Sequence, residues 1–229
     1  MGSVTGQDTY PAAAGWNLIT SSMTDQRRAV RDAYDSLADD YLDQRSDDAP
    51  AVLDELADAL DSGARVLDAG CGQGTPVTDA LAADFDVVGV DFSREQLHLA
   101  RQDVPAARFA QGDMTALPVR SDSFDAVCAF YSVIHVPIAE HERVFAEFAR
   151  VLRPGGTLLS TVGGEAWSGA NPDWLDSGVE MRWSFPDIEE TYETLDAAGF
   201  AVEAEFVVDD ELGSQYPFVL ARYEGRGGC

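Results

Sequence analysis

The stretch RVLDAGCGQGT, Arg65–Thr75, decides how the rest of the sequence is interpreted. Gly70, Gly72 and Gly74 occupy alternate positions just after a short apolar run. Glycine has no Cβ, so it lets the backbone approach a ligand closely or adopt turns that other residues resist. We therefore expect either a loop that cradles a ligand or only a tight turn, and the surrounding sequence has to separate the two.

Apolar runs of strand length alternate with helical patterns along the chain. The strand-like runs cover residues 65–69, 85–91, 107–111, 124–131, 157–162, 201–208 and 216–222. Helical spacing of apolar residues covers 30–41, 53–60, 144–152 and 188–195, and Ser184-x-x-Asp187 predicts the start of the last helix. The alternation predicts an α/β fold, a doubly wound and mostly parallel seven-stranded sheet with helices on both faces.

Length and composition indicate a single domain. The chain has 229 residues, 45% of them hydrophobic, which is enough to bury one core. We expect a flexible N-terminal arm at 1–22, a domain at 23–229 and, within it, a substrate-cap insertion at about 163–185. No apolar run approaches the ~18 residues of a membrane span, and the N-terminus lacks a signal-peptide pattern. We therefore expect a cytoplasmic protein that makes no membrane contact.

The cysteines do not form a recognisable pattern. Cys71, Cys128 and Cys229 are odd in number and far apart, without the spacing of metal ligands. They predict neither a disulfide framework nor a metal site, and they agree with a reducing compartment.

The charge balance is strongly acidic. Asp and Glu number 41 against 15 basic residues, all of them arginine, which gives a net charge of −26. Self-repulsion of this size is screened at molar ionic strength, where the Debye length falls to about 3 Å. The composition favours a protein of a halophilic, salt-accumulating cytoplasm over an ordinary acidic protein. A polyanionic surface also argues against nucleic acid as a partner.

The spacing of the glycines argues against a dinucleotide. In the G-x-G-x-x-G/A fingerprint, the third small residue after Gly70 and Gly72 would stand at position 75, which is Thr75. The third glycine comes one position early, at Gly74. Pro76 suits the first turn of a following helix, whose free amides favour a carboxylate or phosphate.

With Asp68 two positions before Gly70, the stretch resembles the D-x-G-x-G-x-G signature of class I methyltransferases that use S-adenosylmethionine. Further segments typical of that family follow in its usual order: YDSLADDY (34–41), VVGVDFS (87–93), GDMTALPVRSDSFDAV (112–127), SVIHVP (132–137), RVLRPGG (150–156), LDAAGF (195–200) and PFVLAR (217–222). The resemblance implies the class I methyltransferase fold, S-adenosylmethionine as the cofactor and a small-molecule methyl acceptor.

The resemblance also implies a set of cofactor-binding residues. Asp91 ends the second strand about 20 residues past the glycines, where a carboxylate can accept both ribose hydroxyls, although it could instead cap the next helix. Asp113 and Met114 would hold the adenine, and Asp68 would face the methionine ammonium. The full set is Tyr41, Asp68, Gly70, Cys71, Gly72, Asp91, Phe92, Asp113, Met114 and Phe130. Within it, Cys71 can simply pack in the turn, and Tyr41 can be a core tyrosine.

The acceptor side is less defined by the sequence. His135 follows the fourth strand and is the candidate general base, although it can equally be a structural histidine beneath the site. His98 and His141 lie on helical stretches, and we expect both to face solvent. The segment 163–185 contains Trp167, Trp174 and Trp183, which either roof a pocket or fill the core beneath an irregular insertion. The candidate substrate-binding residues are Tyr131, His135 and Trp183.

Three functions remain open at this point. The favoured one is transfer of a methyl group to an O, N or C atom of a small molecule. A non-catalytic S-adenosylmethionine-binding protein would keep every motif above. A nicotinamide-dependent oxidoreductase is the third, and Thr75 argues against it.

Overall fold

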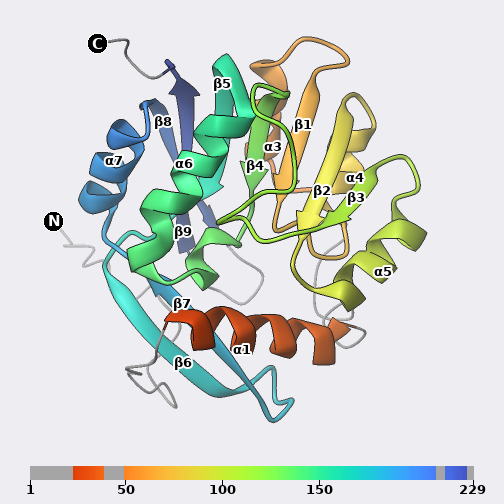
Figure 1. Ribbon diagram of the computed structural model, residues 1–229, viewed down its shortest axis with the longest axis vertical. Helices are drawn as coiled ribbons and strands as arrows, with labels where there is room; N and C mark the ends of the chain where they lie inside the picture. Colours follow the sequence, from red (N-terminus) through yellow and green to blue (C-terminus); the bar gives the residue numbers. More distant parts are fainter. Residues whose placement is uncertain (1–22, 39–48, 210–214, 226–229) are drawn as a thin grey trace, which may run out of the picture.

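The computed structural model describes residues 23–38, 49–209 and 215–225, and its centre is one large sheet (Figure 1). The sheet has seven strands in the order β3-β2-β1-β4-β5-β9-β8. Their bounds are β1 Arg65–Ala69, β2 Asp86–Asp91, β3 Arg108–Gln111, β4 Phe124–Ala129, β5 Leu152–Thr161, β8 Phe200–Asp209 and β9 Gln215–Tyr223. The predicted arm 1–22, Tyr41 and Cys229 lie outside the described residues.

The order of the strands creates the edge at which a ligand can bind. Strands β1 to β5 pair in parallel, whereas β9 is antiparallel to both of its neighbours. The chain runs outward from β1 through β2 to β3 and then returns to place β4 on the other side of β1. This reversal opens a crevice at the carboxyl ends of β1 and β4. The structure confirms the predicted α/β fold class.

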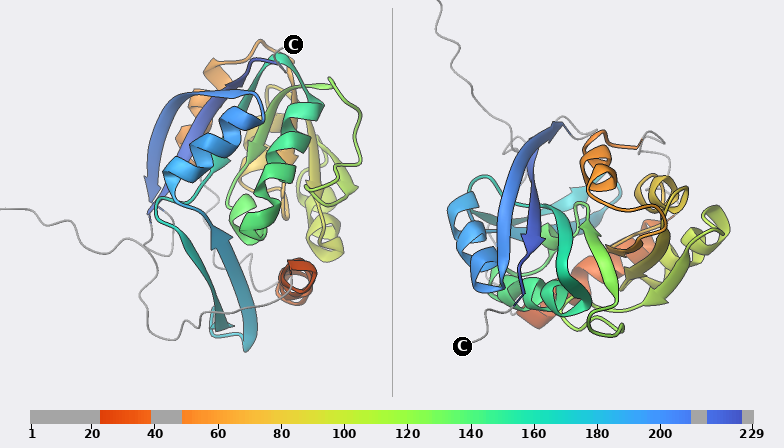
Figure 2. Two further views of the ribbon diagram at one scale, coloured as in Figure 1. Left: turned by 60° about the vertical axis from the view of Figure 1, so that its left-hand side comes forward. Right: turned by 90° about the horizontal axis from the view of Figure 1, so that it is seen from above.

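Helices cover both faces of the sheet (Figure 2). One face carries α3 (Val52–Asp58) and α4 (Val77–Ala82), and the other carries α6 (His141–Val151) and α7 (Ile188–Ala197); α5 (Arg94–Asp103) packs beside β3. Two short 3-10 turns, η1 (Val133–His135) and η2 (Ile138–Glu140), join β4 to α6. Neighbouring residues of one strand therefore enter different cores: Val66 packs on the α3 side, and Leu67 packs on the α6 side.

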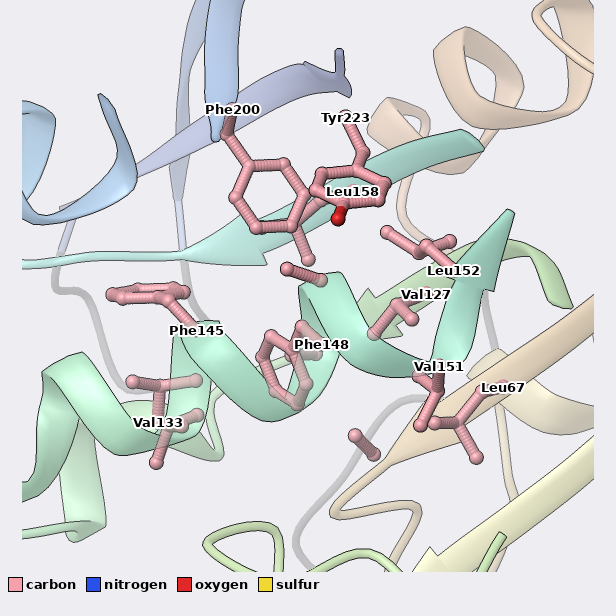
Figure 3. Close-up of a cluster of buried hydrophobic side chains, with 14 of the residues drawn as sticks. Leu67, Val127, Val133, Phe145, Phe148, Val151, Leu152, Leu158, Phe200 and Tyr223 are labelled. Carbon is pink, nitrogen blue, oxygen red and sulfur yellow. The ribbon is translucent and has the colours of Figure 1, made fainter. Parts of the chain in front are cut away.

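The core on the α6 side shows how the helical pattern is used (Figure 3). Phe145 and Phe148 are fully buried and pack with ring centroids 6.0 Å apart. They lie over Leu67, Val127 and Leu158 of the central strands. This core holds the parallel strands, and therefore their carboxyl ends, in fixed positions.

A second unit covers the carboxyl ends of the strands. It consists of α1 (Met23–Ser36), which crosses below the sheet in Figure 1, and of a hairpin of β6 (Trp167–Trp174) and β7 (Val179–Phe185). We call α1 and this hairpin the cap. Val30 of α1 and Trp183 of the hairpin are buried in the same apolar cluster as the α3 side of the sheet. The segment forms an antiparallel hairpin with a register shift between Asn171 and Trp174, so of the two alternatives the irregular insertion does not apply.

The start of the last helix also differs from the expectation. Asp187 is the N-cap of α7, because its side chain accepts a hydrogen bond from the Glu190 amide at 2.9 Å. Ser184 belongs to β7, and its hydroxyl accepts a hydrogen bond from the Ile138 amide at 3.1 Å. The predicted capping signal therefore began one turn too early.

Candidate functional site

The glycine turn, residues 70–74, leaves β1 at the crevice with a backbone that favours glycine. Gly70, Gly72 and Gly74 have φ angles of +83°, +54° and +88°. A Cβ added to Gly70 would lie 2.3 Å from the Cβ of Ser132, so the loop after β4 packs directly on this backbone. At Gly72 the nearest atom to an added Cβ is Oε1 of Gln96 at 3.5 Å. The backbone of the turn is therefore approached closely by the loop after β4, and its contact with a ligand stays a prediction.

An open pocket of about 990 Å³, including its mouth, lies against this turn. It is lined by the ends of β1, β2 and β4, by the loop after β3 and by α1. Every described member of the predicted cofactor set lines it: Asp68, Gly70, Cys71, Gly72, Asp91, Phe92, Asp113, Met114 and Phe130. Of the predicted acceptor residues, Tyr131 and His135 line it as well. The structure therefore brings residues from four separate segments of the sequence into one site.

Two buried carboxylates lie at the base of the pocket. Asp68 accepts a hydrogen bond from the Thr78 hydroxyl at 2.5 Å, and burial, with a smaller effect of the Asp91 charge, raises its pKa to about 7. Asp91 accepts hydrogen bonds from the amides of Gly72 at 2.9 Å and Ser93 at 2.8 Å, while burial raises its pKa to about 6. Ser93, not Asp91, caps α5, because its hydroxyl accepts from the Gln96 amide.

Asp113 lies at the pocket with both carboxylate oxygens already in use. Oδ1 accepts from the amide and hydroxyl of Thr115 at 2.8 and 2.7 Å, and Oδ2 pairs with Arg27 at 2.5 Å. Arg27 also lies 3.0 Å from Glu140. One arginine of α1 thus ties the cap to the loop after β3 and to η2. Sequence reasoning missed Arg27, because 86 residues separate it from Asp113 and no local pattern connects the two.

Cys71 packs within the turn. A Cβ added to Gly89 of β2 would lie 2.8 Å from the sulfur of Cys71, so the Cys71 thiol fills the space that this glycine leaves. Burial raises the pKa of the thiol well above its usual value, and the charges of Asp68 and Asp91 add to the shift. A neutral thiol in this position is a packing group and a poor nucleophile.

Two glutamines in the pocket wall were not predicted. Gln73 and Gln96 are 3% and 1% exposed, and both line the pocket. Neither amide atom of Gln96 has a hydrogen-bond partner, nor does Oε1 of Gln73. Buried polar atoms of this kind normally bind a ligand or an ordered water. A glutamine on an amphipathic helix gives no sequence signal for such a role.

His135 is held by hydrogen bonds from both sides. Its Nδ1 lies 2.8 Å from the backbone carbonyl of Arg182 in β7, and its Nε2 lies 3.0 Å from the hydroxyl of Tyr34 in α1. The ring is 7% exposed and lies against the ring of Trp183 with centroids 5.4 Å apart. Trp183 is not among the residues that line the pocket. Its ring packs against that of Trp174 with centroids 5.8 Å apart, and its role in substrate binding stays a prediction.

The other two histidines differ from each other. His98 is exposed, as predicted. His141 is only 5% exposed, and its Nε2 contacts the Val136 carbonyl at 2.9 Å, so the expectation that it faces solvent is wrong. It lies at the first turn of α6 and faces the core, where burial lowers its pKa.

Within the described part of the chain, metal-binding clusters and membrane-spanning helices are absent. No group of three or more His, Cys, Asp or Glu side chains there could hold a metal ion. None of its helices has the length and apolar character needed to cross a bilayer.

The chain matches a known domain family and is similar to several known proteins. Residues 66–156 match a family model described as a methyltransferase domain. The chain is 33% identical over 189 residues to an uncharacterized transposon protein of Streptomyces fradiae, covering 77% of this chain and 50% of that protein. It is 37% identical over 151 residues to a 27-O-demethylrifamycin SV methyltransferase of Amycolatopsis mediterranei, covering 55% and 54%. The chain spans about half the length of these two relatives.

A solved structure supports the same assignment of the fold. The 1,6-didemethyltoxoflavin-N1-methyltransferase of Burkholderia thailandensis, solved with 1,6-didemethyltoxoflavin and S-adenosylhomocysteine, superposes with a TM-score of 0.71 at 22% identity. The match covers 93% of this chain and 98% of that one. At 22% identity, the likeness shows a shared fold and nothing more.

Proposed function

The chain belongs to the class I methyltransferases that use S-adenosylmethionine, and from this membership we propose that it transfers a methyl group from that cofactor to a small molecule. The observation that carries the proposal is the pair of buried carboxylates, Asp68 and Asp91, beside a glycine turn in one pocket. Family membership favours a sulfonium cofactor over the nicotinamide alternative. No feature of the site favours a purely non-catalytic role.

The residues of the pocket fit S-adenosylmethionine chemically. The cofactor carries an ammonium, ribose hydroxyls and an adenine, and the buried carboxylates of Asp68 and Asp91 suit a cation and hydroxyl donors. The open space beside Gly72 suits a group that approaches the backbone. The partnerless amide of Gln96 offers a donor and an acceptor to the same ligand.

We assign roles to the chain's own groups on this basis. Asp68, kept in place by Thr78, would face the methionine ammonium, together with the carbonyls of Gly70 and Phe130. Asp91 would accept from the ribose hydroxyls while its hydrogen bond to the Gly72 amide keeps the turn in place. When bound, the cofactor supplies an electrophilic methyl group on its sulfonium, so the protein mainly aligns the acceptor and excludes water.

Asp113 and Met114 would hold the adenine. The Oδ2 atom of Asp113 has a second lone pair beside its contact with Arg27, so it can still accept from the exocyclic amine. Phe92 and Cys71 would pack on the nucleoside and behind the turn. His135 is the proposed proton acceptor for substrates that must lose a proton, and Tyr131 is the proposed contact for the acceptor.

The acceptor is a small organic molecule in this proposal, and its reacting atom is O, N or C. Relatives are named as methyltransferases of demethylmenaquinone, of 27-O-demethylrifamycin SV and of 1,6-didemethyltoxoflavin. The aromatic side chains of Phe130 and Tyr131 at the pocket suit a flat or partly apolar acceptor. The acidic composition supports the absence of a nucleic acid partner.

The setting of the protein is part of the proposal. We propose a cytoplasm of high ionic strength, because a net charge of −26 with arginine as the only cation is best tolerated where salt screens it. We also propose that 23–229 is one domain and that the hairpin within 163–185 covers the acceptor.

Calorimetry in molar potassium chloride tests the cofactor. We expect S-adenosylmethionine and S-adenosylhomocysteine to bind and NAD not to bind. A screen of phenols, quinols, amines and carboxylates, with detection of S-adenosylhomocysteine as the product, then tests methyl transfer. Tight binding of NAD without binding of the sulfonium would overturn the proposal, whereas binding without turnover on any acceptor would favour a non-catalytic role.

A further inference from the structure

We propose that Tyr34 is a catalytic residue of this site, and that its hydroxyl takes the proton of the methyl acceptor while passing its own proton to His135. The inference rests on the proposed function and gives a role to a residue to which the family motifs assign none. Tyr34 lies on α1, 101 residues before His135, and both side chains line the pocket.

The hydrogen bonds set the direction of the proton. The carbonyl of Arg182 can only accept, so Nδ1 of His135, 2.8 Å away, carries the hydrogen. In that neutral tautomer Nε2 is an acceptor, and the Tyr34 hydroxyl 3.0 Å away donates to it. A phenol oxygen both donates and accepts, so the same hydroxyl can accept a hydrogen bond from a ligand in the pocket. Tyr34 and His135 thus form one hydrogen-bonded pair in the pocket wall.

The cap holds the rings of Tyr34 and His135 in place. The Tyr34 ring meets the rings of His135 and Trp174 edge to face, with centroids 5.5 and 5.7 Å apart. Trp183 supports the other side of the imidazole, and the side chain of Gln26 donates to the His135 backbone carbonyl at 3.2 Å. Both elements of the cap thus contribute to a preformed arrangement, which reduces reorganisation during a proton transfer.

The proton transfer balances without a further reactant. The nucleophilic atom of the acceptor bonds to the methyl carbon while the carbon–sulfur bond breaks, and the electron pair of that bond stays on sulfur. The acceptor proton moves to the Tyr34 oxygen as the Tyr34 proton moves to Nε2 of His135. The resulting imidazolium donates to the Arg182 carbonyl and to Tyr34, and it later returns the proton to solvent.

This arrangement deepens the proposed substrate class. The acceptor must carry a proton that it loses, which favours a hydroxyl over a tertiary amine. Tyr131 lies beside the pocket with a strained φ of +46°, and its ring packs against Tyr216 and Phe218 at 5.4 and 5.6 Å. Strain of this kind is retained where the surrounding structure requires a particular side-chain position. A flat ring that carries a hydroxyl, as in a phenol or quinol, suits these aromatic walls.

The test compares Tyr34→Phe with wild type on substituted phenols and quinols that differ in acidity. Removing a general acid–base group typically lowers turnover by ~10²-fold or more, so we expect such a loss on weakly acidic acceptors. On acceptors that are already ionised at the assay pH, the loss should fall to less than about threefold, because no proton remains to be moved. A purely structural defect would slow all acceptors alike and would overturn the proposal. Tyr192→Phe, which removes a hydroxyl bound to Glu205 far from the pocket, is the matched control.

A second readout does not depend on turnover. The chain has three histidines, so nitrogen-15 NMR can follow the ring of His135 individually. We expect the Nδ1–H tautomer in wild type and a shifted Nε2 signal in Tyr34→Phe, with unchanged affinity for S-adenosylmethionine by calorimetry. An unchanged Nε2 signal would overturn the pairing of Tyr34 with His135.

The double variant separates a relay from two independent effects. If Tyr34 acts through His135, adding Tyr34→Phe to His135→Gln should slow turnover less than twofold further, whereas additive losses would contradict the relay. Failure to bind S-adenosylmethionine at all would instead overturn the proposed function. Binding of the sulfonium with no turnover on any phenol or quinol would overturn the relay and leave cofactor binding intact.

Discussion

The glycine turn and the cap build opposite sides of one pocket by different means. The turn is supported by groups close in sequence or on a neighbouring strand: Thr78 binds Asp68 ten residues away, and Gly72 binds Asp91 nineteen residues away. The cap is supported by contacts such as Tyr34 with His135 and Arg27 with Asp113, which span 101 and 86 residues. The carboxylates at the turn thus have partners nearby in the sequence, whereas Asp113 and the acceptor side depend on contacts between distant segments.

The two regions also treat polar groups differently. The turn buries carboxylates whose charge is disfavoured in the absence of a ligand, as their raised pKa values show. The cap instead completes the hydrogen bonds of His135 in η1, since Tyr34 of α1 and the Arg182 carbonyl of β7 contact its two ring nitrogens. We therefore expect a bound ligand to stabilise the ionised carboxylates of the turn. We expect changes in the cap to alter turnover more than cofactor affinity.

The largest effect is expected at Gly72. Gly72→Val should lower the affinity for S-adenosylmethionine by ~10³-fold or more, because a branched side chain fills the pocket and the left-handed backbone adds strain of about 1–3 kcal/mol. Calorimetry measures the affinity. Gly63→Val is the control, because Gly63 has a φ of +75° but no atom within 4 Å of an added Cβ. Equal losses in both variants would mean that strain alone acts and that the turn is not the binding surface.

The next effect is a dependence of stability on pH that comes from the turn. The pKa of Asp68 is about 7 in the folded protein against 3.8 as its ordinary value, so the folded state holds its proton more tightly than the unfolded state. Stability from this group is therefore fully present below about pH 4 and is lost as the pH rises towards 7. At about 1.4 kcal/mol per pKa unit, a shift from 3.8 to about 7 corresponds to a total loss on the order of 4 kcal/mol.

Denaturant unfolding of wild type and Asp68→Asn at pH 5 and pH 8 measures that loss. Wild type should lose stability between the two values relative to Asp68→Asn, whose side chain does not titrate. The exposed Asp86→Asn should follow wild type. S-adenosylmethionine should reduce the difference, because its ammonium favours the ionised carboxylate. If the free energy of unfolding changes equally between the two pH values in wild type and Asp68→Asn, the pKa of Asp68 is not raised in the folded protein.

A smaller loss is expected from Asp91→Ala. Removal of a charged acceptor from buried hydroxyl donors usually costs about 1–3 kcal/mol, so the Kd for S-adenosylmethionine should rise roughly 5- to 150-fold. The variant also frees the amides of Gly72 and Ser93, which the carboxylate now binds. Asp91→Asn helps to separate these effects, since it keeps one acceptor oxygen for the turn. Unchanged affinity in both variants would mean that Asp91 does not bind the ribose hydroxyls.

The same contrast explains what the sequence could predict. The sheet, its helices and the residues at the ends of β1, β2 and β3 follow from period and local spacing, because consecutive elements of this fold build them. The hairpin itself was not predicted, because its buried tryptophans, such as Trp174 and Trp183, indicate burial but not the element that carries them. His141 was placed in solvent because helical position alone does not show which face meets the core. Tyr34 belonged to a quoted family segment, but only the tertiary structure brings its hydroxyl to His135.

The smallest effect concerns salt, which should act in opposite directions on the whole chain and on the ion pairs of the cap. Across the whole chain, rising potassium chloride screens a net charge of −26, so the melting temperature of wild type should climb from millimolar to molar salt. The ion pairs of Arg27 with Asp113 and Glu140 hold α1 to the body, with the arginine side chain 25% exposed, and the same salt should weaken them. Partly exposed pairs contribute at most about 1 kcal/mol, so Arg27→Gln should melt only slightly below wild type in dilute salt. That difference should shrink in molar salt while both curves rise, and differential scanning fluorimetry across a salt series measures both trends. If the gap between the two proteins stays constant, the arginine holds α1 by packing and not by charge; if neither curve rises, the acidic composition is not an adaptation to salt.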